Sequence, residues 1–189
     1  MKLILASASP RRRDILDAAK IPYTVHPSSA DETYPAELAA IRVPELLARR
    51  KAEAVVREAA PDAVVVGADT VVLLDGALLG KPRDREDAKR MLRALSGRTH
   101  QVVSGIAVVA GEACLSDTVV TEVEMRPIAE EELEAYVERD LPLDKAGAYG
   151  IQEAAGLFVR GIRGDYYNVV GLPLCRLGEL LAQMGFPLF

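Results

Sequence analysis

The run Ala63–Leu74 constrains the fold more than any other part of the chain, because it is the most apolar stretch of the sequence. An aliphatic run of this length indicates a central, buried strand. Asp69 interrupts it, and a carboxylate there must be paired, hydrogen-bonded or bound to a metal because its desolvation is costly. Gly67, just before it, would let a backbone or a ligand approach closely. We therefore favour a functional role for Asp69 over that of a structural aspartate that caps a turn.

The dipeptide Asp75-Gly76 follows this strand and is a strong signal for a two-residue hairpin. The hairpin would lead into a return strand over residues 77–79. That strand would bring Lys81 back toward Asp69, which is the reason to group these two side chains.

Residues 1–16 predict a strand, a tight loop and a helix. Leu3–Ala6 indicates a short buried strand, and Ser7–Ser9 a loop of small residues. Ser9 at the N-cap and Pro10 at the first helical position are a favourable helix start. The N-terminus of such a helix carries free backbone N–H groups and the positive end of the dipole, so it is a ready phosphate site.

Three arginines follow this helix start. Helical geometry places Arg11 and Arg12 near the side that packs on the sheet, whereas Arg13 shares a polar stripe with Asp17. Positive charge opposes the dipole at this end, so without an anion the arrangement is mildly unfavourable. We therefore favour an anion site over a merely charged helix start, with Arg11 and Arg12 facing the ligand and Arg13 in solvent.

The remaining elements alternate between helix and strand in the first half of the chain, and hairpins fill the middle. The predicted strands are 23–26, 101–109, 115–125 and 157–162, the predicted helices 44–58, 85–95, 128–139 and 174–184, and the predicted loops 144–152 and 164–173. We expect an α/β fold with a mixed twisted sheet and helices on both faces, in a single domain over residues 1–189.

Composition narrows the functional classes. The net charge of −5 argues against a general nucleic-acid-binding surface. Cys114 and Cys175 are too few for a disulfide framework or a thiolate metal site, and they favour a reducing compartment. No stretch is long and apolar enough for a membrane span, and the N-terminal apolar run is too short for a signal peptide. We expect a cytoplasmic protein with no membrane or nucleic-acid partner.

The basic residues of these segments suggest a site for a polyphosphate. Lys51, Lys81 and Lys145, together with Arg11 and Arg12, would neutralise its charge. Lys51 lies in the apolar stripe of its predicted helix, where it could also simply snorkel to solvent. The sequence alone does not decide between these two roles of Lys51.

Asp69 and Glu32 could hold a hard divalent cation through oxygen ligands and water. This combination suits metal-assisted hydrolysis of a phosphoanhydride, with the carboxylate orienting or deprotonating water. Neither a Walker-type glycine loop nor a dinucleotide fingerprint is present. His26 and His100 lie in ordinary strand-like contexts and suggest no catalytic triad.

The motifs of this chain stand in the order of the Maf family of nucleotide pyrophosphatases, which were once described as septum-formation inhibitors. The segments that carry the resemblance are Ser7–Arg12, the helix of Lys51, Gly67–Val71, Gly80–Pro82, Leu95–Gly97, Asp144–Gln152 and Asn168–Pro173. The resemblance implies hydrolysis of a nucleoside triphosphate to its monophosphate and pyrophosphate. It also implies Mg²⁺ or Mn²⁺, a fold like that of the inosine triphosphate pyrophosphatases, and a homodimer.

The same resemblance implies roles for individual residues. Asp69 would be the proton acceptor. The positions linked to substrate choice are Arg12, Thr70 and Gln152, and those that handle phosphates are Ser7, Arg11, Lys51 and Lys81. Lys51 and Lys81 would act with Asp69 in catalysis.

The loop Ala146–Gln152 resembles the branch of the family that acts on dTTP and UTP, whereas the branch acting on 7-methyl-GTP has a different loop. Two positions depart from the family pattern. Glu153 stands where glycine is usual, and Asp165 replaces a small serine. Both would add negative charge near the site.

Two other functional classes would use the same phosphate site. A non-catalytic nucleotide or polyphosphate sensor that restrains cell division through a partner would not need Asp69. A nucleotidyltransferase would need a second substrate. The carboxylate within the predicted central strand favours catalysis over a sensor. A reaction that needs only water as the acceptor would exclude the transferase.

Overall fold

The computed structural model describes residues 1–189, which form two compact units. The first unit comprises residues 1–70, 104–119 and 171–189, and the second comprises residues 71–103 and 120–170. Three long strands pass through both: β3 (Ala63–Leu74), β5 (Thr99–Ala110) and β6 (Ala113–Met125). The seven-stranded sheet has the order β2-β1-β3-β5-β6-β7, with β4 paired to β3. The predicted mixed α/β sheet is confirmed, while the prediction of a single domain stays a prediction.

In the first unit, β1 (Lys2–Leu5) lies parallel to both β2 (Thr24–Val25) and β3. The register pairs Leu5 with Val66, and Ala6 N donates to Val66 O at 2.8 Å. After Ala6 the chain leaves the sheet, whereas β3 continues. The residues of β3 beyond Val66 therefore extend past the carboxyl end of β1.

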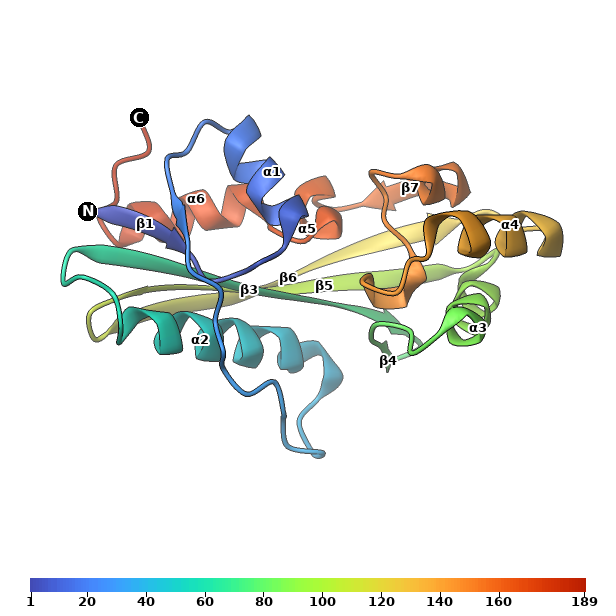
Figure 1. The fold of residues 1–189 in the computed structure, drawn as a ribbon, viewed down its shortest axis with the longest axis horizontal. Helices are drawn as coiled ribbons and strands as arrows, with labels where there is room; N and C mark the ends of the chain where they lie inside the picture. Colours follow the sequence, from blue (N-terminus) through green and yellow to red (C-terminus); the bar gives the residue numbers. More distant parts are fainter. The chain divides into compact units, whose positions relative to one another are not determined.

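Helices cover both faces of the sheet in the first unit, as predicted. α2 (Val43–Val56) lies on one face, and α1 (Pro10–Ala18) and α6 (Leu174–Gln183) lie on the other (Figure 1). Small side chains let α2 pack closely: the buried cluster comprises Ala6, Ala48, Ala52, Val55, Val65, Ala107 and Val109.

Gly67 explains how near α2 comes to β3. A Cβ atom at this position would lie 2.0 Å from the carbonyl oxygen of Ala48, so only glycine fits. Lys51 follows Ala48 by about one helical turn, and Asp69 follows Gly67 by two residues on the same strand. The close approach predicted for Gly67 is therefore one of two backbones, and it brings the lysine and the aspartate to the same place.

The second unit contains the predicted hairpin. β3 and β4 (Ala77–Leu79) pair antiparallel, and the turn residues Asp75 and Gly76 have φ values of 51° and 78°. Positive φ at both positions is what a type I′ turn requires. The hairpin signal in the sequence is thus confirmed.

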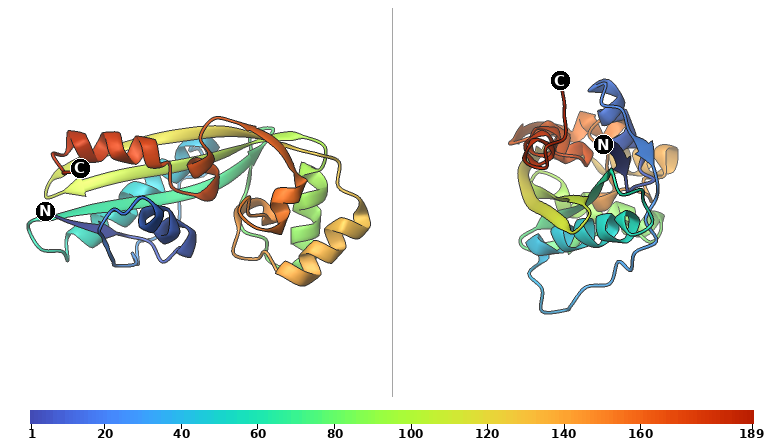
Figure 2. Two further views of the ribbon diagram at one scale, coloured as in Figure 1. Left: turned by 90° about the horizontal axis from the view of Figure 1, so that it is seen from above. Right: turned by 90° about the vertical axis from the view of Figure 1, so that its left-hand side faces the viewer.

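Two helices lie side by side in this unit, α3 (Arg85–Leu95) and α4 (Glu130–Asp140) (Figure 2). Asp84 caps α3, since its carboxylate accepts a hydrogen bond from Asp87 N at 2.8 Å. The helices and the strands of this unit enclose one hydrophobic core. Its buried residues include Val72, Leu92, Val102, Val123, Met125, Leu133 and Phe158. β7 (Val159–Arg163) pairs antiparallel with β6.

Three local predictions were wrong or incomplete. Ser9 is the N-cap residue and Pro10 begins α1, as predicted, but the Ser9 side chain makes no capping hydrogen bond; its backbone N–H donates to Ser7 Oγ at 3.3 Å. The predicted loop 164–173 contains a short helix, α5 (Tyr166–Val170). The structure also contains three short 3-10 helices that were not predicted. Ala40–Arg42 precedes α2, Ala146–Ala148 lies in the 144–152 loop, and Ala154–Phe158 precedes β7.

His100 has a role that the sequence did not reveal. It is buried, and its Nε2 lies 2.7 Å from the hydroxyl of Tyr149, which is also buried. Burial lowers the pKa of His100 to about 4. The same cause raises the pKa of Tyr149. This pair fastens β5 to the 144–152 loop within the second unit.

We expect the buried, neutral His100 to make the free energy of unfolding fall as the pH drops from 6.5 toward 4. In that window the unfolded chain binds a proton that the folded chain does not, so stability rises with pH, by up to about 3 kcal/mol for the full shift. Urea unfolding of the wild type and His100→Gln at pH 7 and pH 4.5 measures this. The difference in free energy of unfolding between the wild type and His100→Gln should be smaller at pH 4.5 than at pH 7. A stability difference between the two proteins that is independent of pH would contradict the assignment.

No helix of the structure is both long and apolar enough to span a bilayer.

Candidate active site

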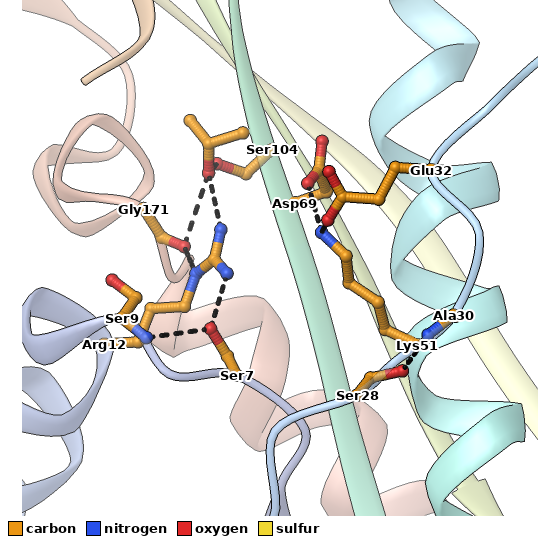
Figure 3. A network of polar contacts seen from close by, with 11 residues as sticks. Ser7, Ser9, Arg12, Ser28, Ala30, Glu32, Lys51, Asp69, Ser104 and Gly171 are labelled. Carbon is orange, nitrogen blue, oxygen red and sulfur yellow. Dashed lines mark hydrogen bonds and ion pairs between the residues drawn. The ribbon is translucent and has the colours of Figure 1, made fainter. Parts of the chain in front are cut away.

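The candidate site of the first unit lies where β3 extends past the end of β1. Asp69 and Thr70 are neighbours on β3, so their side chains point to opposite faces of the sheet. Figure 3 shows the consequence: a network around Arg12 lies on one side of the strand, and a group around Lys51 lies on the other. Each helix layer thus supplies one half of the site.

Arg12 is the centre of the first network. Its Nε donates to Gly171 O at 2.8 Å, its Nη1 to Ser7 Oγ at 2.9 Å, and its Nη2 to Thr70 Oγ1 at 3.4 Å. A guanidinium group has five N–H donors, so two remain to offer to an anion. Arg12 therefore joins four segments and is held in one orientation before any ligand binds.

The backbone of Gly171 suits this role. Its φ of +124° is unfavourable for other residues, and a Cβ there would lie 3.5 Å from Thr70 Oγ1. That distance is ordinary van der Waals contact, so the backbone conformation that turns the carbonyl oxygen toward Arg12, and not a lack of space, is what favours glycine. Burial lowers the pKa of Arg12, as does Arg11, whereas Asp69 and Glu32 act in the opposite direction. Since arginine titrates so far above neutrality, the group stays charged.

Ser104 belongs to the same network, and sequence reasoning missed it. It is fully buried on β5, and its hydroxyl oxygen lies 2.8 Å from that of Thr70. The contact fixes the Thr70 hydroxyl that accepts from Arg12. The available signal was a single polar side chain within the apolar run 102–110, since buried polar groups need a partner.

Lys51 is the centre of the second group. Its Nζ lies 2.7 Å from Asp69 Oδ1 and 2.8 Å from Glu32 Oε1. The Lys51 and Asp69 side chains are only 13% and 16% exposed, whereas Glu32 is 64% exposed. The lysine therefore does not simply snorkel to solvent. It pairs with two carboxylates, one nearly buried and one at the surface.

The two carboxylates suit a hard divalent cation. Both direct an oxygen to within hydrogen-bond distance of one positively charged nitrogen, so they already converge on a single cation. The structure contains no group of three or more histidine, cysteine, aspartate or glutamate side chains arranged to hold a metal. A closed protein cage is thus absent. Mg²⁺ needs none, because it binds through one or two carboxylates and completes its shell with water and phosphate oxygens.

The first unit therefore unites most of the predicted residues. Ser7, Arg12 and Thr70 share one network, and Glu32, Lys51 and Asp69 share the other. Arg11 lies in the first turn of α1, partly exposed, and Arg13 is exposed, as the helical geometry predicted.

Lys81 and Gln152 belong to the second unit, and both are exposed. Gly147 N donates to Gly80 O at 3.1 Å, so the segments that carry Lys81 and Gln152 are joined. Their grouping with Asp69 stays a prediction.

Lys145 differs from the expectation that it helps to neutralise a polyphosphate. It is buried, and its Nζ lies 2.9 Å from Asp144 Oδ1 and 3.2 Å from Glu153 Oε2. Two carboxylates of its own loop therefore already offset its charge.

A surface hollow of about 670 Å³ lies beside α1, away from these networks. Its lining residues are Arg13, Asp14, Asp17, Ile21, Pro22, Tyr23 and Val25. The two aspartates make it unsuitable for a polyphosphate, and none of the predicted site residues reaches it.

Known proteins resemble this chain along nearly its whole length. It is 50% identical to the dTTP/UTP pyrophosphatase of Symbiobacterium thermophilum, covering 100% of this chain and 96% of that protein. It is 47% identical to the dTTP/UTP pyrophosphatase of Alkaliphilus metalliredigens, covering 95% and 94%. Among solved structures, a dITP/XTP pyrophosphatase from Mycobacterium abscessus aligns over 97% of both chains, with 16% identity and a TM-score of 0.46.

The sequence model of one family, described as Maf-like protein, matches residues 2–184. This match and the identities to the curated relatives lead to one conclusion: the chain belongs to the Maf family.

Proposed function

We propose that this chain is a nucleoside triphosphate pyrophosphatase that converts dTTP and UTP to the monophosphate and pyrophosphate. The observation that carries the proposal is the low exposure of Asp69, held by Lys51 on the strand that also presents Thr70 to Arg12. Family membership and the names of the relatives support the same reaction. A sensor that only bound nucleotides would need the Arg12 network but not the carboxylate.

In the proposed reaction, water attacks the α-phosphorus, the bond to the bridging oxygen breaks, and pyrophosphate leaves. Asp69 accepts the proton of the attacking water. Arg12, with its two remaining N–H groups and the N-terminus of α1 nearby, stabilises the negative charge that develops on the phosphoryl oxygens. Lys51 orients the Asp69 carboxylate, and Ser7 holds the guanidinium group of Arg12 toward the phosphates.

Asp69 and Glu32 are the residues that would hold Mg²⁺ or Mn²⁺. When bound, the ion supplies charge neutralisation at the phosphates and makes water more acidic. Lys51 contacts both carboxylates and would have to share them with the ion. This arrangement predicts that the metal binds weakly to the free protein and more tightly together with the triphosphate.

The remaining assignments follow the family resemblance. Arg11 and Lys81 would contact the phosphates, while Arg12, Thr70 and Gln152 would select the substrate. We further propose that the protein acts as a homodimer in the cytoplasm. The two cysteines, which form no disulfide, are compatible with a reducing compartment.

A pyrophosphate-release assay over the common triphosphates tests the proposal. We expect dTTP and UTP to give the highest kcat/KM, and excess chelator to reduce release by at least about 10²-fold, because the phosphate charge is then left unneutralised. Added Mg²⁺ or Mn²⁺ should restore release. Binding of dTTP without any release of pyrophosphate would favour the sensor and overturn the proposal.

A further inference from the structure

The loop 144–153, which carries Gln152, is crossed by an ion pair whose lysine is buried. The side chain of Lys145 is only 9% exposed, although it ends in an ammonium group. Asp144 lies beside it in the chain, whereas Glu153 lies at the far end of the loop. The contact between Lys145 and Glu153 therefore ties the two ends of the loop together.

Gly150 lies directly against the side chain that makes this contact. A Cβ atom at this position would lie 3.1 Å from Cε and 3.2 Å from Cδ of Lys145, which is tighter than ordinary packing. The lysine stem therefore passes close against the backbone of Gly150. The backbone then turns, with Glu153 N donating to Gly150 O at 3.1 Å, and places the Glu153 carboxylate at the ammonium group.

Other contacts hold the first part of the loop. The Tyr149 hydroxyl is hydrogen-bonded to His100, and the backbone N–H of Gly147 is hydrogen-bonded to Gly80 O. Gln152 follows these anchors, is exposed, and directly precedes Glu153. The Lys145–Glu153 pair is thus the anchor next to the residue that the family resemblance links to substrate choice.

We propose that Glu153 is a positioning residue, which through Lys145 holds the turn that presents Gln152 and so sharpens the choice of base. The inference rests on the proposed function, in which Gln152 contacts the base. It also gives a reason for the departure at this position, where the family usually has glycine. In this account the added carboxylate serves to hold the loop through its contact with Lys145.

Glu153→Gln tests this proposal, because it keeps the size of the side chain and removes the charge. We expect amide hydrogen exchange in residues 146–152 of the free protein to accelerate about three- to tenfold, as befits the loss of one partly exposed ion pair. The ratio of kcat/KM for dTTP to that for dGTP should fall by a similar factor. The fall should come from a higher KM for dTTP, since a displaced base contact weakens binding and leaves kcat nearly unchanged.

The matched control is Glu124→Gln, which removes the same charge from an exposed pair with Arg160 in the same unit. It should alter neither exchange in the loop nor the dTTP preference. A double-mutant cycle of Glu153→Gln and Lys145→Gln adds a second measurement. The ratio of kcat/KM for dTTP to that for dGTP should be no lower in the double variant than in Lys145→Gln alone.

The outcomes separate this inference from the proposed function. Unchanged exchange in Glu153→Gln would show that the pair does not hold the loop, and faster exchange with an unchanged base ratio would show that the loop does not set the preference. An equal drop in kcat for all nucleotides would indicate general damage. Each of these results overturns the inference. Absence of pyrophosphate release from the wild type would instead overturn the proposed function, and the positioning role with it, while the exchange measurement would still report on the ion pair.

Discussion

Replacing Asp69 by asparagine is expected to lower kcat for pyrophosphate release from dTTP by roughly 10²–10⁴-fold, the usual contribution of a general base. The two side chains have nearly the same shape. The amide oxygen of asparagine can still accept the hydrogen bond that Lys51 Nζ now donates to Asp69 Oδ1 at 2.7 Å. The substitution therefore keeps the contact with α2 but removes the negative charge and the capacity to accept a proton.

Two further measurements show whether the loss of kcat comes from Asp69 itself. Asp62→Asn is the matched control, because Asp62 is an exposed aspartate just before the same strand, and its replacement should leave kcat unchanged. Calorimetry with Mg²⁺ present should show that Asp69→Asn still binds dTTP, since the Arg12 network is intact. A kcat within about threefold of the wild type would remove Asp69 from the proposed mechanism.

Much of the fold was predictable because local signals agreed with tertiary packing. The aliphatic run of β3, the Asp75-Gly76 turn and the Asp84 cap each specify one structure by chain chemistry alone. α5 was missed because a helix of five residues is too short to show a periodic apolar face. Ser9 and Pro10 stand at the predicted helix start, but the Ser9 hydroxyl makes no capping hydrogen bond, because the rotamer of the side chain decides this and the residue type does not fix it.

The candidate site was predictable only where a side chain violates its local pattern. Asp69 in an apolar strand and Lys51 in an apolar stripe are such violations, and the structure pairs them. The acceptor at Gly171 could not be found this way, because it is a backbone carbonyl that any residue carries. The Lys145–Glu153 pair was equally hidden, since its geometry depends on how the loop closes around Gly150.

Arg12 and Arg13 are adjacent arginines with different expected roles, so their alanine variants can be compared directly. Arg12→Ala is expected to lower kcat/KM by roughly 10²–10³-fold, because it removes a held positive charge at the place proposed for the phosphates. Arg13→Ala should be nearly silent. Arg13 is next to Arg12 in the sequence and carries the same charge, but its side chain is exposed and takes no part in the network of Arg12. Equal effects of the two substitutions would contradict the assignment.

Arg12 also has a structural role, and the experiment must separate the two. Its removal takes away the hydrogen bonds to Ser7, Thr70 and Gly171 O, so the free energy of unfolding should fall by about 1–3 kcal/mol. Activity is therefore compared well below both unfolding midpoints, and with added guanidinium at concentrations too low to unfold either protein. Guanidinium should partly restore kcat/KM of Arg12→Ala and leave Arg13→Ala unaffected. A variant that is folded, inactive and not rescued would mean that Arg12 acts by organising the loop 7–9 and β3, because a lost charge can be resupplied by a small cation whereas a lost arrangement of the backbone cannot.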